Sequence, residues 1–350
     1  MNYLEIIQNV LSNGVQKTAT RYDSNGEVIP VENGTVGTFC EIFRHDMSKG
    51  FPLTTLRRMP WKSIRVELEG FIKGVTDKKW YQERGCKFWN EWANPVLVDK
   101  EENELAEYEV GICESRLGCS PEEMEEFDCI EVPTRKEIQA ELTDLGPIYG
   151  YQWRSFGQNY MMDNWGHPNC FSETEDLLAY PDKMDGVPNG FDQFNSIVEK
   201  LKSSPYDRRM VCSAWNPLQM HMMALPPCHW AFNVVVYGDK LNLIWHQRSC
   251  DLLLGVGSNI ASYALLLLLL CEESGLKPGE LVGTLADCHI YENHLPAAKE
   301  LVGRVEGVLP EVKIDRKPDG SFSIFDWTYD QVDLLGYEPQ DKLDIGAVTV

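Results

Sequence analysis

Cys228 is the residue whose neighbours most favour chemistry. It stands in the sequence Pro226-Pro227-Cys228-His229, beside prolines and an imidazole, where a strand is predicted to begin. A free thiol titrates near ~8.5, so a cysteine nucleophile needs nearby cations to form the thiolate. On position alone an isolated cysteine is more often a small core residue, and the choice depends on other motifs.

Two arginine motifs support the nucleophile. Asp207-Arg208-Arg209 and Gln247-Arg248-Ser249 place guanidinium groups at the ends of strand-like segments. Guanidinium groups bind phosphate in a bidentate manner and stabilise a nearby thiolate. A solvated basic surface is the alternative, but the strand-like setting favours a phosphate site beside a reactive thiol.

The overall charge limits the ligands that such a site can take. The chain has 350 residues, with 32 Lys and Arg against 54 Asp and Glu, a net charge of −22. Broad nucleic-acid binding needs a cationic surface, so no nucleic-acid partner is expected. An anion must instead be bound by a local cluster of arginines.

Cysteine usage and apolar runs indicate the compartment. The 11 cysteines form no C-x-x-C pair, so no metal site is predicted, and Met1-Asn2-Tyr3-Leu4-Glu5 lacks the features of a signal peptide. We therefore expect reduced thiols and a cytoplasmic protein. The longest apolar run, 260–271, is shorter than the ~20 residues of a membrane span, which predicts a buried core helix and no membrane partner.

The hydrophobic pattern predicts a single α+β domain over 1–350. Residues 98–141 are rich in glutamate, which predicts an acidic surface insertion. A solvated face is favoured over the alternative, a segment that docks a partner. The expected helices cover 1–20, 62–74, 80–92, 191–202 and 259–273, and the expected strands cover 210–215, 230–237 and 241–246.

The order of the motifs resembles the thymidylate synthase family over nearly the whole chain. Further matches in sequence and order are Gly50-Phe51-Pro52-Leu53, Trp89 through Trp92, Leu145 through Gly150, Ser213 through Asn216, and His289-Ile290-Tyr291. The resemblance implies an α+β fold with a six-stranded mixed sheet and flanking helices, and a homodimer formed sheet to sheet. It also implies dUMP as substrate and 5,10-methylenetetrahydrofolate as co-substrate.

The resemblance assigns roles on the nucleotide side. Cys228 matches the nucleophile that attacks C6 of the pyrimidine, and Arg208 and Arg209 match arginines donated to the phosphate site of the neighbouring subunit. The other matched nucleotide ligands are Arg21, Arg248 and Ser249 for the phosphate, and His289 and Tyr291 for the ribose hydroxyl.

Further matches concern proton transfer and the folate. Glu67 matches the carboxylate that organises proton-transfer waters, and Tyr149 the residue that assists removal of the C5 proton. Asp251 matches a ligand of the pterin ring beside the nucleotide. The rest of the implied folate site is Trp89, Trp92, Leu225, Leu254, Gly255, Ser258 and Thr349, while His229, Cys250 and Cys288 read as supporting structure.

Asn259 indicates which base is bound. A carboxamide donates to a carbonyl and accepts from a ring N–H, which fits O4 and N3–H of uracil. Cytosine presents the opposite pattern, and cytosine-using relatives carry Asp at the matching position. Because mismatched buried polar groups are costly, Asn259 predicts dUMP in preference to dCMP.

The chain departs from the family mainly on the folate side. Synthases usually read L-G-x-P-F-N, E-L-L-W-F and W-D-E-W, where this chain has Leu254-Gly255-Val256-Gly257-Ser258-Asn259, Glu67-Leu68-Glu69-Gly70-Phe71 and Trp89-Asn90-Glu91-Trp92. Loss of a phenylalanine wall at Gly257 and Ser258 admits water, and Glu69 is a candidate to orient it.

These departures predict hydroxymethylation of dUMP. The expected source is then a virus that builds modified bases into its DNA, with the enzyme in the cytoplasm of the host. Thymidylate synthesis is the alternative, and Trp89, which synthases keep, favours it. An inactive, dUMP-binding regulatory homologue is a remote alternative. A Rossmann-type binder is a weaker one, because Gly255-Val256-Gly257 is an incomplete motif in the wrong context.

Overall fold

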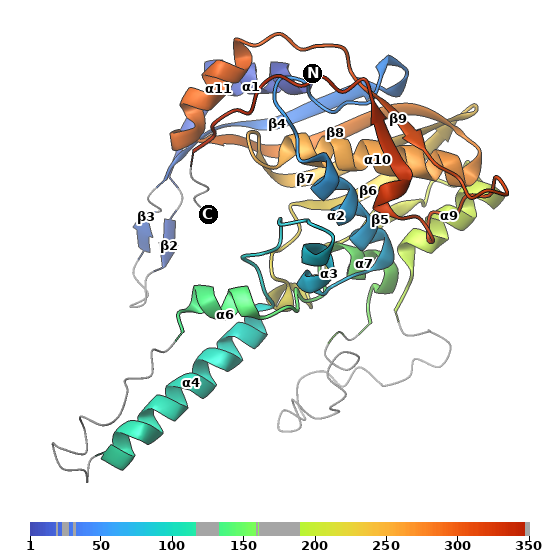
Figure 1. The fold of residues 1–350 in the computed structure, drawn as a ribbon. Coiled ribbons are helices and arrows are strands. Elements are labelled where there is room, and N and C mark those ends of the chain that lie inside the picture. Colours follow the sequence, from blue (N-terminus) through green and yellow to red (C-terminus); the bar gives the residue numbers. More distant parts are fainter. Residues whose placement is uncertain are drawn as a thin grey trace.

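The computed structural model places one six-stranded mixed sheet at the centre of the molecule (Figure 1). It describes residues 1–18, 20–22, 28–30, 33–116, 133–158, 160 and 190–346, and the side chains of all of these except 20–22, 28–30 and 106–116.

The sheet has the order β1-β4-β8-β7-β6-β5. Its β7 and β8 run parallel, and every other neighbouring pair is antiparallel. This confirms the mixed sheet that the family resemblance implies. The strands are β1 (Val15–Lys17), β4 (Thr35–Asp46), β5 (Val211–Ser213), β6 (His229–Tyr237), β7 (Lys240–Asp251) and β8 (Lys277–Tyr291), with two small hairpins, β2 (Thr20–Tyr22) with β3 (Val28–Pro30) and β9 (Glu311–Ile314) with β10 (Val332–Leu335).

Helix α10 (Val256–Ser274) packs on one face of the sheet and forms the centre of the core. Tyr263 of this helix stacks on Trp245 of β7 with ring centroids 5.4 Å apart. The helix is long and apolar enough to cross a membrane, yet 78% of its apolar window is buried inside the protein. It is therefore placed as the core helix that the apolar run predicts.

Shorter helices surround this core. Helix α2 packs against α10 and α7, and α7 packs against α9, so these helices cover the same side of the sheet. These shorter helices are α1 (Tyr3–Asn13), α2 (Trp61–Lys73), α3 (Lys78–Glu83), α7 (Tyr149–Ser155), α9 (Gln193–Ser203) and α11 (Leu295–Val302), with 3-10 turns η1 (Met47–Lys49), η2 (Met220–Met222), η3 (Glu292–His294) and η4 (Tyr329–Gln331).

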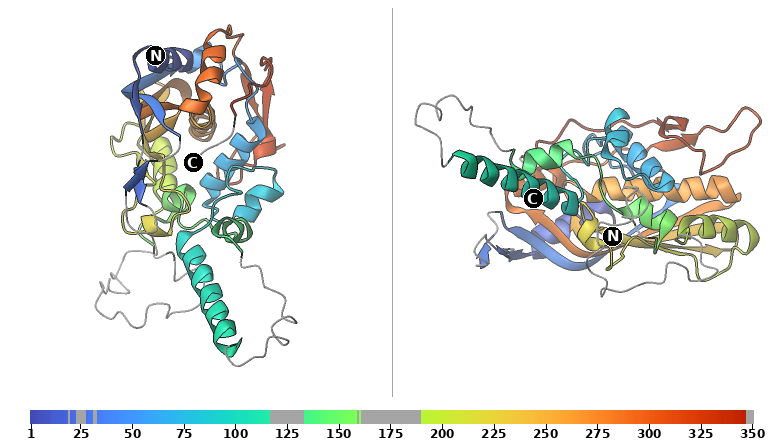
Figure 2. Two further views of the ribbon diagram at one scale, coloured as in Figure 1. Left: turned by 90° about the vertical axis from the view of Figure 1, so that its left-hand side faces the viewer. Right: turned by 90° about the horizontal axis from the view of Figure 1, so that it is seen from below.

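Two helices of the acidic segment extend from the body (Figure 2). Helix α4 (Pro95–Arg116) projects outward, and α6 (Arg135–Glu141) lies at its base. Arg135 pairs with Asp99 at 2.8 Å and also with Glu102. A small apolar cluster of Ala93, Val98 and Ile138 joins the two helices near the body. We call α4 and α6 the projecting helix pair.

The opposite face of the sheet carries exposed apolar side chains. Ile42, Val211 and Trp230 are 39%, 53% and 37% exposed. Successive side chains of a strand point to opposite faces, so Ile42 points away from the α10 side, where its neighbour Phe43 contacts Trp245. This face of the sheet is open to a further protein layer.

Three predicted elements were wrong at their ends. The helix expected over 1–20 stops at Asn13, because Gly14 turns the chain into β1. The helix expected over 80–92 is only α3, since Gly85 has a φ of 81° and ends it. The strand expected over 241–246 extends to Lys240–Asp251, which carries Arg248 and Asp251 within one strand.

One glycine in α2 gives a test of core packing. A Cβ added at Gly70 would lie 2.3 Å from Cε1 of Tyr81, a buried residue whose hydroxyl donates to the Val75 carbonyl at 3.0 Å. We predict that Gly70→Ala lowers the free energy of unfolding by ~1–3 kcal/mol, although alanine favours helix. Urea denaturation checks this, with Lys62→Ala on the exposed side of α2 as control.

If the clash with Tyr81 is the cause, the smaller leucine of Tyr81→Leu should relieve it. The double variant Gly70→Ala with Tyr81→Leu should then lose less free energy of unfolding than the sum of the two single variants. Additive losses in the double variant would show that Tyr81 is not the cause.

Candidate active site

Cys228 and Arg248 meet where β6 begins beside β7. The Cys228 carbonyl accepts a hydrogen bond from the Arg248 N–H at 2.8 Å. The Arg248 guanidinium donates to the carbonyls of Pro226 at 2.7 Å and Pro227 at 3.0 Å, and its Nη2 lies 4.0 Å from the Cys228 Sγ. The proline residues thus hold the guanidinium beside the thiol, as the sequence motifs predicted.

The resting thiol is nevertheless protonated. Burial raises the pKa of Cys228 above its ordinary value, although the Arg248 charge and a hydrogen bond with Tyr149 act in the opposite direction. The guanidinium lowers the pKa of the thiol, as expected of a neighbouring cation, but burial outweighs it in the free protein. The attack requires a proton to leave Cys228 when the ligand binds.

Glu67 of α2 is a second neutral acid in the site. Its Oε1 accepts a hydrogen bond from the Trp89 indole at 3.0 Å. Part of the residue reaches solvent, but its carboxyl end is enclosed, and this burial raises its pKa from 4.5 to about 8, against the effect of the Trp89 hydrogen bond. A carboxyl group that titrates near neutral pH can both give and take a proton.

Tyr149 connects the thiol to the aromatic core. Its hydroxyl accepts the Cys228 N–H at 2.8 Å, and its ring stacks on Phe71 at 4.8 Å. Burial, together with the charge of a Cys228 thiolate, holds the Tyr149 pKa well above 10. The hydroxyl therefore stays neutral and can act as a hydrogen-bond donor or acceptor.

His229 has a supporting place beside these groups. Burial lowers its pKa to about 3, and its Nδ1 lies 3.0 Å from the Tyr263 hydroxyl. A neutral imidazole in this position orients core rings and supplies no charge to the thiol.

Asn259 is held by a residue to which the sequence assigned no role. Gln247 donates from Nε2 to the Asn259 Oδ1 and to the Ser249 carbonyl, each at 3.0 Å, and accepts from the Trp245 indole at 3.1 Å. Because the Trp245 indole can only donate, it fixes the orientation of the Gln247 amide, and Gln247 in turn fixes that of the Asn259 carboxamide. The Asn259 oxygen keeps a second lone pair that can accept a hydrogen bond from a ligand. The position of Gln247 inside the arginine motif was the available signal.

The parallel pairing of β7 and β8 brings three further predicted residues together. Asp251 and His289 are direct register partners, and Tyr291 follows on β8. The Asp251 Oδ1 accepts from the N–H groups of Leu253 and Leu254 at 2.9 and 3.0 Å. The Tyr291 ring lies 5.5 Å from that of His289, and burial, with the charges of Asp251 and Cys228, raises the pKa of Tyr291.

Most of the predicted folate residues are partly enclosed and described. Trp89 and Ser258 are buried, whereas Trp92, Leu225, Leu254 and Gly255 are half-buried. Thr349 lies outside the described residues, and so does the side chain of Arg21.

Arg208 and Arg209 are exposed and distant from Cys228 in the same chain. The adjacent Met210 carbonyl accepts from the Val234 N–H. Six residues of extended chain separate Val234 from Cys228, a distance of about 20 Å. An arginine side chain cannot cover that distance, so these two residues do not join the site of their own chain.

Glu69 does not face the site, which corrects the expectation that it orients a water there. It accepts from the Lys73 ammonium and from the Tyr329 N–H at 2.8 Å. Two residues along a helix turn the side chain by about 200°, so Glu69 lies roughly opposite Glu67 on α2.

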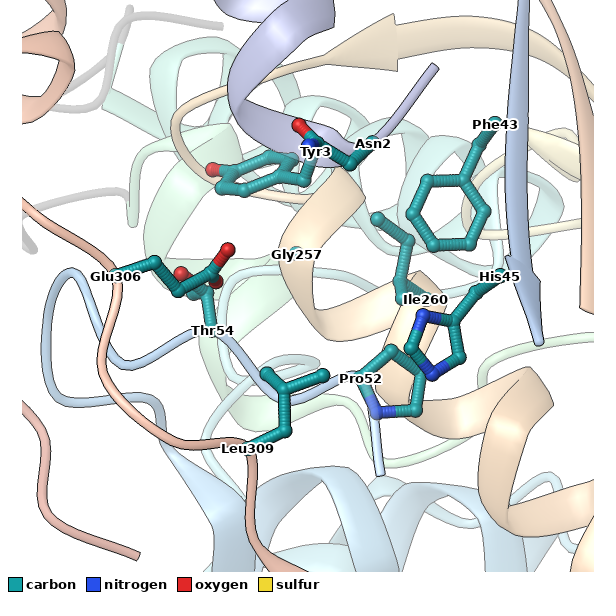
Figure 3. Close-up of a pocket in the computed structure, with 10 residues that line it drawn as sticks. All are labelled: Asn2, Tyr3, Phe43, His45, Pro52, Thr54, Gly257, Ile260, Glu306 and Leu309. Carbon is teal, nitrogen blue, oxygen red and sulfur yellow. The ribbon is translucent and has the colours of Figure 1, made fainter. Parts of the chain in front are cut away.

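Gly257 opens a different cavity from the one expected. Its absent Cβ would meet Met59 at 3.0 Å and Tyr3 at 3.7 Å. Figure 3 shows the cavity beside it, of about 40 Å³, with Glu306 and His45 among its lining residues and none of the predicted site residues. It has room for a few water molecules, and the space gained at Gly257 does not belong to the Cys228 site.

The raised pKa of Glu67 makes stability depend on pH. Between pH 4.5 and 8 the folded state keeps a proton that the unfolded state releases, so the free energy of unfolding falls as pH rises. We predict that Glu67→Gln, which retains an acceptor for Trp89, removes a fall of a few kcal/mol between pH 5 and 8.5. Urea denaturation at both values tests this.

The exposed Glu91→Gln serves as the control and should follow the unmodified protein. A Glu67→Gln protein with the unchanged pH slope would mean that Glu67 is already ionised at neutral pH.

Comparison with known proteins agrees with this geometry. Residues 1–349 match a family model described as thymidylate synthase. The chain is 35% identical over 335 residues to the thymidylate synthase of Mycoplasma genitalium, covering 96% of this chain and 95% of that protein. It is also 34% identical over 343 residues to the bifunctional dihydrofolate reductase-thymidylate synthase of Paramecium tetraurelia, covering 98% of this chain and spanning 60% of that protein's length.

The family-model match over 1–349 and the 35% identity to a full-length relative show that the chain belongs to the thymidylate synthase family of one-carbon transferases, which use 5,10-methylenetetrahydrofolate as co-substrate.

Proposed function

We propose that this chain transfers a one-carbon group to C5 of dUMP, and the contact of Arg248 with both the Cys228 thiol and its proline turn carries the proposal. The thiolate adds to C6 of uracil, and the electron pair that moves to C5 forms a bond to the methylene carbon of the folate while a carbon–nitrogen bond of that methylene breaks. Loss of the C5 proton then breaks the remaining carbon–nitrogen bond. The thiolate leaves C6 when the exocyclic carbon accepts hydride from the folate, giving dTMP, or water, giving the hydroxymethyl product. A phosphate next to Arg248 is attracted by a guanidinium that is already oriented.

Two groups serve the proton transfers that this addition requires. The carboxyl group of Glu67 titrates near neutral pH and can exchange protons with waters around the base. The neutral Tyr149 hydroxyl lies at the Cys228 backbone and is placed to orient a water that takes the C5 proton. Asn259, with its oxygen oriented by Gln247, supports uracil as the base.

The product supported best is dTMP, with dihydrofolate. Hydroxymethylation rested on three departures, and two of them do not act at the site, because Glu69 faces Lys73 and Gly257 faces Met59. Trp89, buried and bonded to Glu67, keeps a large apolar wall where water must be excluded. Hydroxymethyl-dUMP, with tetrahydrofolate, is the second candidate, favoured by the small side chain of Ser258.

We also propose that the enzyme is a homodimer formed through the open face of the sheet. Ile42, Val211 and Trp230 give that face an apolar surface that a second copy would bury. Arg208 and Arg209 lie about 20 Å from the Cys228 of their own chain and are exposed, Arg209 beside Asp207 at 3.1 Å, so in a dimer they can serve the phosphate site of the other chain.

The product is predicted to be dTMP when the enzyme is incubated with dUMP and 5,10-methylenetetrahydrofolate. Mass spectrometry of the nucleotide, with identification of the folate product, makes the measurement. Cys228→Ser is the control and should give neither product, because a hydroxyl is a far weaker nucleophile than a thiol. Hydroxymethyl-dUMP with tetrahydrofolate would assign the reaction to the second candidate, and Ser258→Phe should then shift the product toward dTMP.

Mixed dimers test the shared site. Cys228→Ser and the double variant Arg208→Ala with Arg209→Ala should each be inactive alone. After the two are unfolded and refolded together, a mixed dimer has one complete site, so activity should recover to about a quarter of the wild-type value. Refolding each variant separately is the control, and an inactive mixture would mean that the arginines do not act across the interface.

A further inference from the structure

Lys78, the first residue of α3, is a buried lysine whose hydrogen-bond partners among the described residues are backbone carbonyls. The residue is 1% exposed. Its Nζ lies 2.7 Å from the Gln139 oxygen, 3.1 Å from that of Ala140, and 3.3 Å from those of Asn90 and Trp92. Burial lowers the pKa of Lys78, with the nearby Asp77 acting against the shift. A lysine is seldom buried this deeply unless its charge is needed to hold other groups.

The four carbonyls belong to two separate segments. Gln139 and Ala140 lie in the last turn of α6, where helix carbonyls lack partners and the helix dipole is negative. Asn90 and Trp92 belong to the segment 89–92. This segment carries Trp89 and Trp92, which the proposed function places against the folate and which we call the folate wall. One ammonium group thus joins the base of the projecting helix pair to the folate wall.

Other contacts fix the same two segments from their far sides. Trp89 is bonded to Glu67 at 3.0 Å. Ala93 follows the segment directly and packs with Val98 and Ile138 of the projecting helix pair. The wall is therefore held by Glu67 at one end and by Lys78 and the helix pair at the other.

We propose that Lys78 is a positioning residue for the folate site, and that the projecting helix pair is the scaffold against which it fixes the segment 89–92. The inference rests on the proposed function, in which Trp89 and Trp92 bind the folate. The acidic segment then contributes to folate affinity through α6 and the start of α4. It does not contribute to dUMP binding.

The test compares Lys78→Met, which keeps the length and removes the charge, with Lys79→Met at the exposed neighbouring position. The KM for 5,10-methylenetetrahydrofolate should rise by about tenfold in Lys78→Met, while the Kd for dUMP from calorimetry and the Lys79→Met enzyme stay unchanged. Lys78→Arg keeps several donors and should recover part of the folate KM. Equal losses for both substrates, or no change in either, would overturn the proposal.

Two further measurements keep the test decisive. Amide hydrogen exchange of 89–94 and 138–142 should speed up in Lys78→Met without any ligand, and unchanged exchange would contradict the link itself. If Lys78→Met does not fold, Arg135→Ala replaces it, because this variant loosens α6 from α4 at exposed positions. It should likewise raise the KM for the folate and leave the Kd for dUMP unchanged. An unchanged folate KM in Arg135→Ala would reject the role of the helix pair. A wild-type enzyme that binds no folate would instead refute the proposed function.

Discussion

The contact of the Arg248 guanidinium with the Pro226-Pro227-Cys228 turn is the interaction on which the site depends. It exists because β6 and β7 pair with His229 opposite Gln247, which sets the residue after Gln247 against the residue before His229. The same register carries Gln247 toward Asn259, and the continuation of β7 beside β8 brings Asp251 to His289. The two pairings of β7 therefore position Cys228, Arg248, Asn259, Asp251 and His289, the residues to which the proposed function assigns roles.

Burial decides the protonation state of that site before any ligand binds. The pKa values of Cys228, Glu67 and Tyr149 all move upward, and each group is driven toward its neutral form by loss of water. In a chain with a net charge of −22, neutral Cys228, Glu67 and Tyr149 side chains beside the oriented Arg248 guanidinium add little repulsion against a nucleotide phosphate. The raised pKa of Cys228 favours the thiol over the thiolate in the free protein.

Local patterns predicted the parts of this arrangement that depend on sequence neighbours. The helices α2, α9 and α10 and the Cys228 and Arg248 motifs followed from periodicity and residue type. The direction of Glu69 and Gly257 did not, because motif matching along the chain does not tell which side of a helix faces a site that distant residues build. Lys78 gave no signal, since its partners are carbonyls, which every residue has, from segments 12 to 62 residues away.

Gly70 shows why a departure from a family motif near an active site need not alter the chemistry. The family motif E-L-L-W-F has a tryptophan where this chain has Gly70, and the space beside Gly70 is filled by the ring and hydroxyl of Tyr81. A large side chain on α3 thus occupies the space beside the position at which the family motif carries a tryptophan on α2. Tyr81 belongs to the same short helix as Lys78, so α3 carries both the filler of this gap and the cation that holds the tryptophan segment. The changes around the folate wall are therefore coupled in packing, and they explain a rebuilt support for the wall without requiring a different reaction at Cys228.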